Sequence, residues 1–540
     1  MLTPLEYWLP PEQSEVAIVR SAKHWQQQTQ SDGIGNESAA LALIHRAFTH
    51  KTAPGIRSGD KRPAEQLTVE VFRRPLTLSG EVEFTVTHKR NFSLGSTAED
   101  SSDQGNDDEG IVDAEIVDED NADEFGFDED NGDDDNGNDD STIEDNSLSV
   151  ELYYPLSNTA SVFASATGNH TVTYLAGDKR SSDWELELDQ FWFAIDELFD
   201  SDFDFRLGKQ YFYDDRQWWW DTVLDSVSIS YWGDSISFEL AVGEDMIVLS
   251  NRESSLNPED KDILSVLGQL DWQVLDDHTL SLFFISKKDH STTERPDAVI
   301  APDKEDAVDM DLRWFGLRAS GYWDTDWGFF NYWVDTARVR GKETVIDFEA
   351  EELGNLMVAM DSETFTVDGW ALDLGLTWEA DLSWNPFLTL SYAIGSGTSD
   401  AEEYRDNSFR QSGMQSNINT YNDINYILYY GELLDPELSN LRIATLAAGM
   451  PLLDNSSLQI AYHKYAQYKP ADFLRSAALD SYPSGEDSDI GEEMDLIIGL
   501  EEWVHWELEF IAAVFKAGDA YDLSSDELVK SIYFKINYNF

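Results

Sequence analysis

Residues 206–221 read RLGKQYFYDDRQWWWD, and this stretch concentrates side chains that could do chemistry. Adjacent aspartates beside an arginine could act as an acid–base pair, and the tryptophans Trp218 to Trp220 could stack on sugar rings. The same residue types also suit an anchor at a membrane interface or the rim of a pore. The composition and the strand pattern of the whole chain decide among these three interpretations.

The chain carries no sequence motif of a known catalytic centre. We find no G-x-S-x-G, H-E-x-x-H, phosphate-binding loop or dinucleotide fingerprint. With 106 Asp and Glu residues, paired carboxylates are too common for spacing to single out a glycosidase pair. His463 and His505 are isolated, so we expect them to be structural or pore-lining. The prediction is therefore a protein that is not an enzyme and uses no cofactor.

The composition excludes several other classes. The formal net charge is −70 with only 36 Lys and Arg, whereas a nucleic-acid-binding protein needs a basic face for the phosphates. The chain has no cysteine, so disulfides and thiolate metal sites are ruled out. Aromatic residues make up 13% of the chain, including 18 Trp and 22 Tyr, and these two residue types collect at membrane–water boundaries.

Neither a transmembrane helix nor a signal peptide is predicted. Uninterrupted apolar runs of about 18 residues, the length that spans a bilayer as a helix, do not occur. The first residues, MLTPLEYWLPPEQSEV, lack a basic segment followed by an apolar one. Because the strand pattern described below indicates an outer-membrane protein, we expect that the leader is absent from this numbering.

Residues 1–65 differ from the rest of the chain. The segments QSEVAIVRSAKHWQQQ and ESAALALIHRAFTHK predict short helices, separated by the loop SDGIGN. We expect a helical, periplasmic N-terminal extension that packs locally or binds a partner. A catalytic role for His45 or His50 is the less favoured alternative.

Residues 97–146 form an acidic low-complexity tract with the central sequence DEFGFDEDNGDDDNGNDDSTIEDN. Such a segment repels itself and cannot bury a core, so we expect a disordered, solvated loop. Its carboxylates also suggest weak Ca²⁺ binding, although the EF-hand spacing is not met. The candidate calcium ligands are Asp128, Asp130, Asp133 and Asp135.

From residue 75 onward the dominant pattern has a period of two residues. In GEVEFTVTH, Glu81 and Glu83 alternate with Val82 and Phe84, and the final segment SIYFKINYNF alternates in the same way. One face of each strand is small or polar, and the other is aliphatic or aromatic. The predicted strands are 75–91, 146–156, 159–174, 184–198, 202–213, 221–232, 235–248, 262–275, 278–287, 310–323, 327–340, 369–379, 386–396, 438–451, 456–468, 490–501, 505–515 and 528–540.

The connections between these strands alternate strictly in length. The short ones are PLSNT, FDSD, WGDS, LDDH, WDTD, DLSWN, LLDNS and EEWVH, and nine longer polar ones lie between them. Short turns on one side and long loops on the other are typical of transmembrane β-barrels. A sheet can span hydrocarbon only if it closes, because every backbone N–H and C=O must be paired there. We therefore predict an all-β fold in which residues 66–540 form an outer-membrane antiparallel barrel of about 18 strands.

The topology follows from this prediction. With both termini in the periplasm, the eight short turns are periplasmic and the nine long connections are extracellular. The acidic tract is then the first extracellular loop, and Phe540 ends the last strand on its lipid-facing side.

Several stretches resemble the alginate-export porins of Gram-negative outer membranes. They are RLGKQYFYDDRQWWWD, NPEDKD, FRQSGMQSN, GELLDPELSNLRIATL, AYHKY, DIGEEMDL and FKAGDAY, and they are spread over residues 75–540 in the family's order. The resemblance implies an 18-stranded barrel that passively exports an acidic polysaccharide through a narrow, arginine-rich lumen, without covalent chemistry or a cofactor. It also implies a periplasmic loop near EEWVH that helps to close the pore. This loop is short here, so we expect the gate in the long extracellular loops or in residues 1–65.

The strand pattern predicts which residues line the pore and its rim. By alternation Arg206 faces the lumen, whereas Lys209 has the opposite phase unless a bulge intervenes. A lumen of mixed charge is expected, because acids share the polar phase of other strands. The remaining candidate cations are Arg216, Arg313, Arg318, Arg442 and Lys464, and the candidate acids are Glu81, Glu83, Asp373, Asp495, Glu507 and Glu509.

Two functions remain open from the sequence. The first is an exopolysaccharide exporter that works with a synthase and a periplasmic scaffold, in contact with outer-membrane lipid and lipopolysaccharide. The second is a general or cation-preferring diffusion porin on the same barrel. Within residues 214–220, we expect Trp218, Trp219 and Trp220 near the outer membrane boundary, at least one of them as a belt residue and another in contact with a sugar ring or over the pore mouth. Asp214, Asp215 and Arg216 are expected to form an ion network that fixes the loop.

Overall fold

The computed structural model describes residues 67–92, 94, 140–175, 179–246, 250–251, 256–291, 295–350, 356–398, 404–421, 425–479, 481–521 and 528–540. The predicted helical extension and the candidate calcium ligands Asp128, Asp130, Asp133 and Asp135 lie outside these ranges. Among the described residues, no helix has the length and apolar character needed to cross a membrane.

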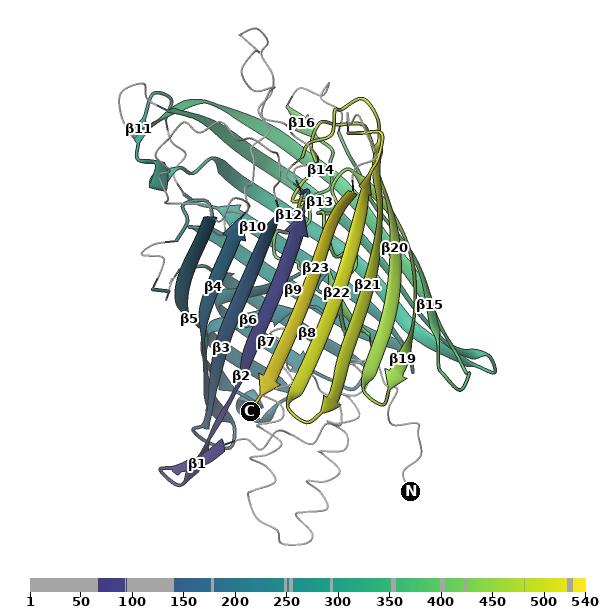
Figure 1. Cartoon of the computed structure of the whole chain (residues 1–540). Coiled ribbons are helices and arrows are strands. Elements are labelled where there is room, and N and C mark those ends of the chain that lie inside the picture. The colour runs from purple at the N-terminus through teal and green to yellow at the C-terminus, as the bar shows by residue number, and fades with distance from the viewer. Residues whose placement is uncertain are drawn as a thin grey trace.

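The described residues form a closed antiparallel barrel (Figure 1). Each wall strand pairs with the next one along the chain, and the last strand pairs with the first, so the wall has no open edge. The 18 wall strands are β2 (Arg74–Arg90), β3 (Ser141–Pro155), β4 (Ala160–Leu175), β5 (Lys179–Ile195), β6 (Phe203–Tyr213), β7 (Asp221–Trp232), β8 (Ile236–Glu244), β9 (Ile263–Leu275), β10 (His278–Asp289), β12 (Val308–Thr325), β13 (Gly328–Ala350), β14 (Met357–Ala380), β15 (Phe387–Gly395), β19 (Leu441–Leu453), β20 (Ser456–Gln467), β21 (Asp489–Trp503), β22 (Trp506–Ala517) and β23 (Leu528–Asn539).

Five short strands and two 3₁₀ turns complete the described elements. β1 (Leu67–Val71) forms a hairpin with β2 just before the barrel wall, and β17 (Ile418–Tyr421) pairs with β18 (Asn425–Leu428). The others are β11 (Val299–Ile300), β16 (Arg405–Asp406), and the 3₁₀ turns η2 (Leu198–Asp200) and η3 (Pro302–Lys304).

The predicted barrel and its strand order are confirmed, but some strands are longer than predicted. β3 begins at Ser141, so residues 141–146 belong to the wall and not to the acidic loop. β13 and β14 continue to Ala350 and from Met357, where a long loop was expected. In the segment GKETVIDFEA polar and apolar residues still alternate, and this segment pairs with β14. The backbone hydrogen bonds of this pairing therefore continue β13 and β14 into the region where the loop was expected.

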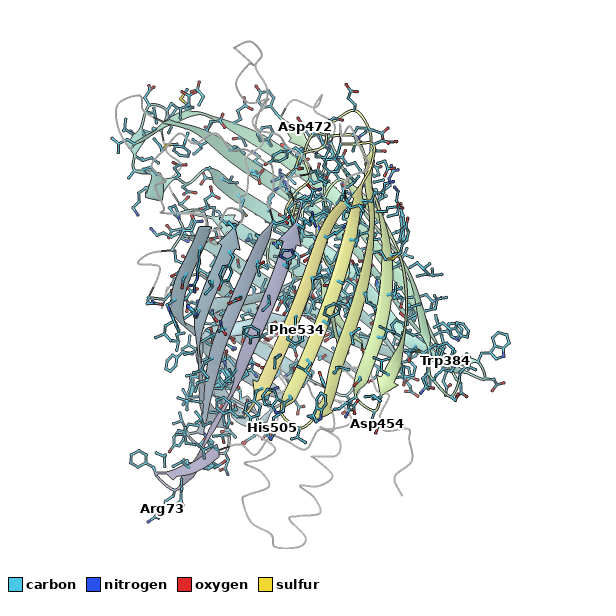
Figure 2. The ribbon with its side chains drawn as sticks, in the orientation of Figure 1. Arg73, Trp384, Asp454, Asp472, His505 and Phe534 are labelled. Atoms are coloured by element: carbon cyan, nitrogen blue, oxygen red, sulfur yellow. The ribbon has the colours of Figure 1, made fainter. Side chains whose placement is uncertain are left out.

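Side chains alternate between the outer surface and the lumen. In β3, Leu148 and Leu152 are exposed on the outside, whereas Glu151 and Tyr153 are buried inside. This apolar exterior is the pattern that faces lipid, because polar side chains there would lose their hydration. Figure 2 shows Phe534 midway along the outer wall.

The two ends of the barrel differ as the turn lengths predicted. Figure 2 places Asp454 and His505, both in short turns, at the end where the C-terminus also lies. Asp472, in the connection between β20 and β21, lies at the other end. In the predicted orientation the C-terminus is periplasmic, and the long connections are then extracellular.

Candidate functional site

The tryptophan loop, residues 214–220 between β6 and β7, folds into the lumen. Trp218, Trp219 and Trp220 are only 2%, 2% and 1% exposed. The prediction that Trp218, Trp219 and Trp220 lie at the membrane boundary is therefore wrong. The indoles find enough apolar surface inside the barrel to be buried completely, which stabilises them more than a half-exposed position in a belt.

Asp214 shapes this loop. Its Oδ1 accepts hydrogen bonds from the backbone N–H of Trp219 at 2.8 Å and of Trp220 at 3.4 Å, and its Oδ2 accepts one from the N–H of Arg216 at 3.2 Å. Arg318 of β12 contacts the same carboxylate, with 2.6 Å between Nη1 and Oδ2. One buried carboxylate thus turns the loop and joins it to the wall.

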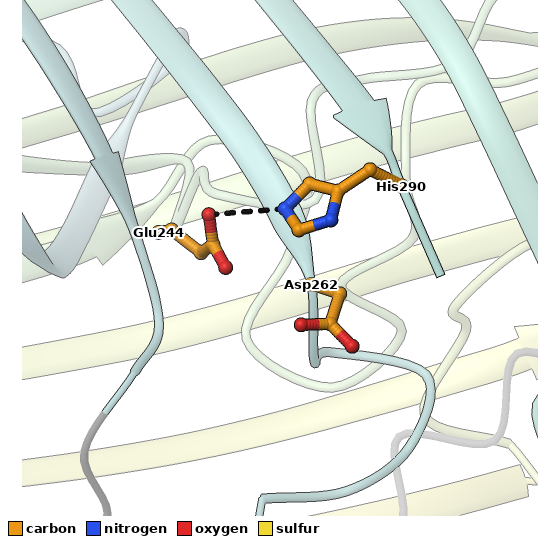
Figure 3. A group of neighbouring side chains, drawn as sticks. All are labelled: Glu244, Asp262 and His290. Carbon is orange, nitrogen blue, oxygen red and sulfur yellow. Dashed lines mark hydrogen bonds and ion pairs between the residues drawn. The ribbon is translucent and has the colours of Figure 1, made fainter. Parts of the chain in front are cut away.

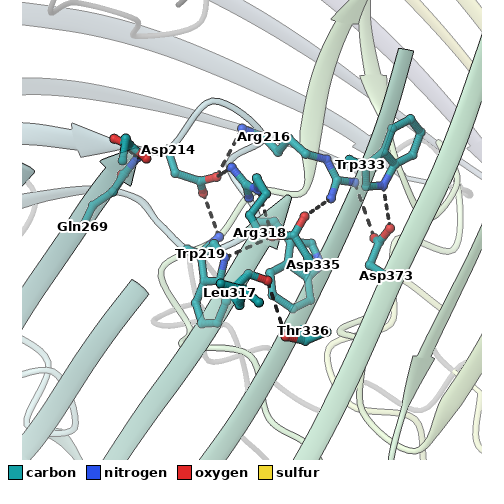
Figure 4. A network of polar contacts seen from close by, with 12 residues as sticks. Asp214, Arg216, Trp219, Gln269, Leu317, Arg318, Trp333, Asp335, Thr336 and Asp373 are labelled. Carbon is teal, nitrogen blue, oxygen red and sulfur yellow. Dashed lines mark hydrogen bonds and ion pairs between the residues drawn. The ribbon is translucent and has the colours of Figure 1, made fainter. Parts of the chain in front are cut away.

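Arg216 connects the tryptophan loop to β13 and β14 (Figure 4). Its Nη1 donates to Asp335 of β13, and its Nη2 lies 3.4 Å from Oδ2 of Asp373 of β14. Asp335 also accepts from Nε of Arg318 at 2.8 Å and from Nε1 of Trp219 at 3.3 Å. The chain Asp214–Arg318–Asp335–Arg216–Asp373 is a continuous ion network. The ionic role expected of Asp214 and Arg216 is therefore confirmed, whereas Asp215 is exposed and is not a member of this network.

Aromatic rings enclose the Arg216 guanidinium. It lies 4.7 Å from the ring centre of Trp333 and 4.3 Å from that of Tyr429, and its Nε donates to the Tyr429 hydroxyl at 3.1 Å. Burial alone would lower the pKa of Arg216. The oxygen groups of Tyr429, Asp373 and Asp335 outweigh that effect and hold the pKa well above the ordinary value for arginine. Arg216 therefore stays charged in this site.

Trp219 packs directly on the barrel wall. Its ring stacks on Phe283 of β10 at 4.9 Å with an interplanar angle of 12°. On β12, a Cβ at Gly316 would lie 1.9 Å from the Trp219 ring. Only glycine leaves room for the indole there, because any side chain would overlap it.

A second inward segment, residues 404–421 and 425–440, packs against the tryptophan loop. The Trp218 ring stacks on Phe409 at 6.1 Å, and the Ser412 hydroxyl donates to the Trp219 carbonyl at 2.7 Å. Arg410 pairs with Asp406 at 2.7 Å and with Glu343 of β13. Arg410 is thus a third arginine that lies between two acids, and its contact with Glu343 joins this segment to the wall.

The same segment also contacts the opposite arc of the wall. The carboxylate of Glu493 on β21 accepts hydrogen bonds from the backbone N–H of Leu433 at 2.8 Å and of Leu434 at 3.1 Å. Tyr465 of β20 donates to the carbonyl of Tyr430 at 2.8 Å. We call residues 214–220, 404–421 and 425–440 together the lumen plug, because they bridge from β10–β14 to β20–β21 inside the barrel.

The predicted pore residues divide between the two faces of the wall. The structure directs Arg206 and Arg318 inward, and Arg206 lies 5.0 Å from the ring centre of Trp192. All six predicted acids face inward, and four of them are buried. These acids are Glu81, Glu83, Asp373, Asp495, Glu507 and Glu509.

Four predicted cations do not face the lumen. Arg313 lies 3.2 Å from Asp311 and is exposed, and Lys464 lies 2.6 Å from Asp489. Arg442 lies over the Tyr468 ring and donates to the Tyr468 carbonyl, on the exposed face of β19. Lys209 shares its phase with the exposed Leu207 and lies 4.0 Å from Asp245 at the rim. These residues were candidates because of their charge, but the strand phase directs them to the outer face of the wall. Charged side chains are tolerated there because they reach water near the ends of the strands.

The described lumen also contains an acidic cavity away from the plug. Its volume is about 300 Å³, and it lies along β2 to β5. Every lining residue is polar, and four of the seven are acidic: Glu83, Asp145, Ser147, Asn169, Thr171, Asp183 and Glu185. This arc of the wall favours cations.

Sequence reasoning missed several residues that hold the plug. Asp335, Tyr429 and Arg410 were not candidates, although FRQSGMQSN and GELLDPELSN were recognised as motifs. The signal available was the apolar content of an apparently extracellular loop. Leu433, Leu434 and Leu438 are buried, and three such residues in one loop suit an interior better than water.

The fold and the plug together define a class: a transmembrane β-barrel whose lumen is partly filled by its own extracellular connections. The comparisons with known proteins give the family. A model described as alginate export matches residues 121–532 of this chain. The chain belongs to the alginate-export family and is a β-barrel of the Gram-negative outer membrane.

The chain is also similar to individual known proteins. The chain is 24% identical over 339 residues to the alginate production protein AlgE of Pseudomonas aeruginosa, covering 59% of this chain and 67% of that protein. It is 26% identical to AlgE of Azotobacter vinelandii, covering 52% of this chain and 58% of that protein. Among solved structures, OccK5 (OpdH) of Pseudomonas aeruginosa has a TM-score of 0.47 and 10% identity, covering 86% of this chain and 98% of that one.

Proposed function

We propose that this chain is the outer-membrane channel through which an alginate-like acidic exopolysaccharide leaves the cell. The observation that carries the proposal is the extent of the family match, because residues 121–532 include both inward segments of the plug as well as the wall. A family model that spans the plug supports a shared transport mechanism and not a shared barrel alone.

The chemistry of the plug suits a uronate polymer. Arg216, Arg318 and Arg410 each contact two carboxylates of the protein. A uronate residue offers the same group, and arginine binds carboxylates through two parallel N–H donors. An arriving polymer can therefore replace the protein carboxylates one at a time, and the plug loosens as its ion pairs are exchanged. Such transport needs no covalent step, which agrees with a channel that is not an enzyme.

The partners follow from this role. The exposed apolar wall contacts outer-membrane lipid and lipopolysaccharide, and the periplasmic end receives the polymer from a secretion scaffold. A scaffold of this kind would dock near the short turns, for example those at Asp454 and His505 (Figure 2).

The acidic cavity supports a second candidate, a cation-preferring porin. Four carboxylates line it, and its lining includes no basic residue among the described ones. Small cations would pass along β2 to β5 while the plug stays closed.

Planar-bilayer recordings of the purified protein distinguish the two functions. For an exporter we expect a small resting conductance that polyuronate reduces or interrupts from the periplasmic side, and that a neutral polysaccharide of equal length leaves unchanged. Strong cation selectivity without any effect of polyuronate would refute the exporter and favour the porin.

A further inference from the structure

Three potential metal ligands meet on the outer surface of the barrel, on the other face of the wall from the lumen plug. Glu244 is the last residue of β8, Asp262 directly precedes β9, and His290 directly follows β10. Their donor atoms all lie within 4.8 Å of one another (Figure 3). Because β8, β9 and β10 are neighbours in the wall, the three side chains share the extracellular rim.

The side chains also share one face of the wall. Glu244 has the phase of the exposed Leu240 and Val242, and Asp262 has the phase of the exposed Leu264. His290 has the phase of Leu282, which is exposed as well. All three therefore point outward.

The backbone holds two of the ligands in place. The N–H of His290 donates to the carbonyl of Asp262 at 3.0 Å, which extends the β9–β10 ladder by one pair. Asp262 adopts a left-handed conformation with φ of 64°, so the chain turns sharply at this residue. Ligands on rigid strand ends lose little freedom on binding, which favours a preformed site.

The spacing of the donors fits a small metal ion. Nε2 of His290 lies 3.2 Å from Oε2 of Glu244. Two ligands bound at about 2.0 Å to a tetrahedral Zn²⁺ are about 3.3 Å apart, so this pair already has the required separation. The exposed Lys261 lies 3.5 Å from Asp262 Oδ2, but such a surface ion pair contributes little and does not fix the carboxylate.

We propose that Glu244, Asp262 and His290 form a binding site for a divalent transition-metal ion of the Zn²⁺ type on the extracellular rim. One imidazole and two carboxylates form a donor set of this kind, whereas Ca²⁺ and Mg²⁺ select oxygen ligands alone. Three protein ligands leave a fourth position for water or another small ligand. The site does not depend on the transported substrate, since it lies outside the lumen.

The test is Zn²⁺ titration of the full-length, untagged protein in detergent, with Ca²⁺ in excess to occupy carboxylate-only sites. We expect His290→Ala to lose one bound Zn²⁺ per chain relative to the wild type, and Asp262→Asn to lose the same equivalent. Heat-modifiable migration on a gel verifies that each variant keeps its barrel.

A matched control is His170→Ala. His170 also lies on the wall, but its ring bonds to the Ser182 hydroxyl at 3.0 Å and stacks on Trp184. This variant should keep the wild-type Zn²⁺ stoichiometry. Equal Zn²⁺ binding by wild type and His290→Ala would overturn the proposal, as would full displacement of this equivalent by the excess Ca²⁺.

Discussion

Replacing Arg216 with alanine should release the lumen plug. In the docked plug Arg216 neutralises two buried carboxylates, Asp335 and Asp373. Without it, each carboxylate keeps part of its coordination: Asp335 retains Arg318 at 2.8 Å, and Asp373 retains Nε1 of Trp333 at 2.7 Å. The free-energy cost to the docked plug is therefore that of losing one arginine, because the rest of the ion network remains.

The magnitude follows from these remaining contacts. Removing one partner of a buried ion pair costs about 3–5 kcal/mol, and the retained donors place Arg216 near the lower value. This penalty applies only while the plug is docked, because water reaches the carboxylates once the loop leaves. At 1.4 kcal/mol per tenfold change, about 3 kcal/mol raises the ratio of undocked to docked plug by roughly 100-fold.

Single-channel recording in planar bilayers measures this ratio as open probability. We expect Arg216→Ala to open far more often than the wild type, and Arg216→Lys to lie between them, because lysine keeps the charge but not the planar fork. Arg442→Ala is the matched control, since Arg442 lies on the outer face over Tyr468, and its described contacts do not include the plug. If Arg216→Ala and Arg442→Ala both behave like the wild type, the ion network does not hold the plug.

Three further predictions concern the plug and the acidic wall. Gly316→Ala should displace Trp219 and raise the open probability, because the new Cβ would lie 1.9 Å from the indole, whereas Gly268→Ala, with 3.7 Å to Leu240, should not; equal conductance of the two variants would contradict this. Neutralising Glu83 and Asp183 together, as Glu83→Gln and Asp183→Asn, should reduce the preference for K⁺ over Cl⁻ in a reversal-potential measurement, and an unchanged potential would show that ions avoid the β2–β5 cavity. Burial, with a contribution from Glu493, raises the pKa of Asp435 to about 7. The docked plug thus binds this proton more tightly than the undocked plug, so docking strengthens as the pH falls from above 7 towards 4 and weakens above 7. Conductance should fall on acidification, and Asp435→Asn should flatten this dependence; the same slope in the variant would assign it to another group.

The barrel itself was predictable because each of its determinants is local. The alternation of polar and apolar residues in a segment such as GEVEFTVTH indicates a strand with two different faces. The strict alternation of short and long connections indicates that successive strands are antiparallel. The inward direction of Arg206 followed from phase alone. Arg313, Arg442 and Lys464 were misplaced where residue type was given more weight than phase.

The interior was not predictable for a different reason. Whether residues 214–220 lie at a membrane boundary or inside a lumen depends on Phe283, Gly316 and Asp335, which are distant in sequence and act only after the barrel closes. The composition of this loop, with polar residues and three tryptophans, is compatible both with a membrane boundary and with a barrel lumen. The tertiary structure decides, because only the assembled wall offers both an apolar surface for the indoles and carboxylates for Arg216.

Local patterns in the sequence thus specify the wall of this protein: a barrel of about 18 strands, its predicted orientation and its family resemblance. Periodicity and turn length encode these features residue by residue, and closure follows because hydrocarbon tolerates no unpaired backbone. What fills the barrel depends instead on the assembled fold. Three features depend on side chains that separate strands or loops bring together: the plug, the acidic cavity along β2 to β5 and the Glu244–Asp262–His290 group. A local sequence pattern does not predict contacts between residues that are distant in sequence.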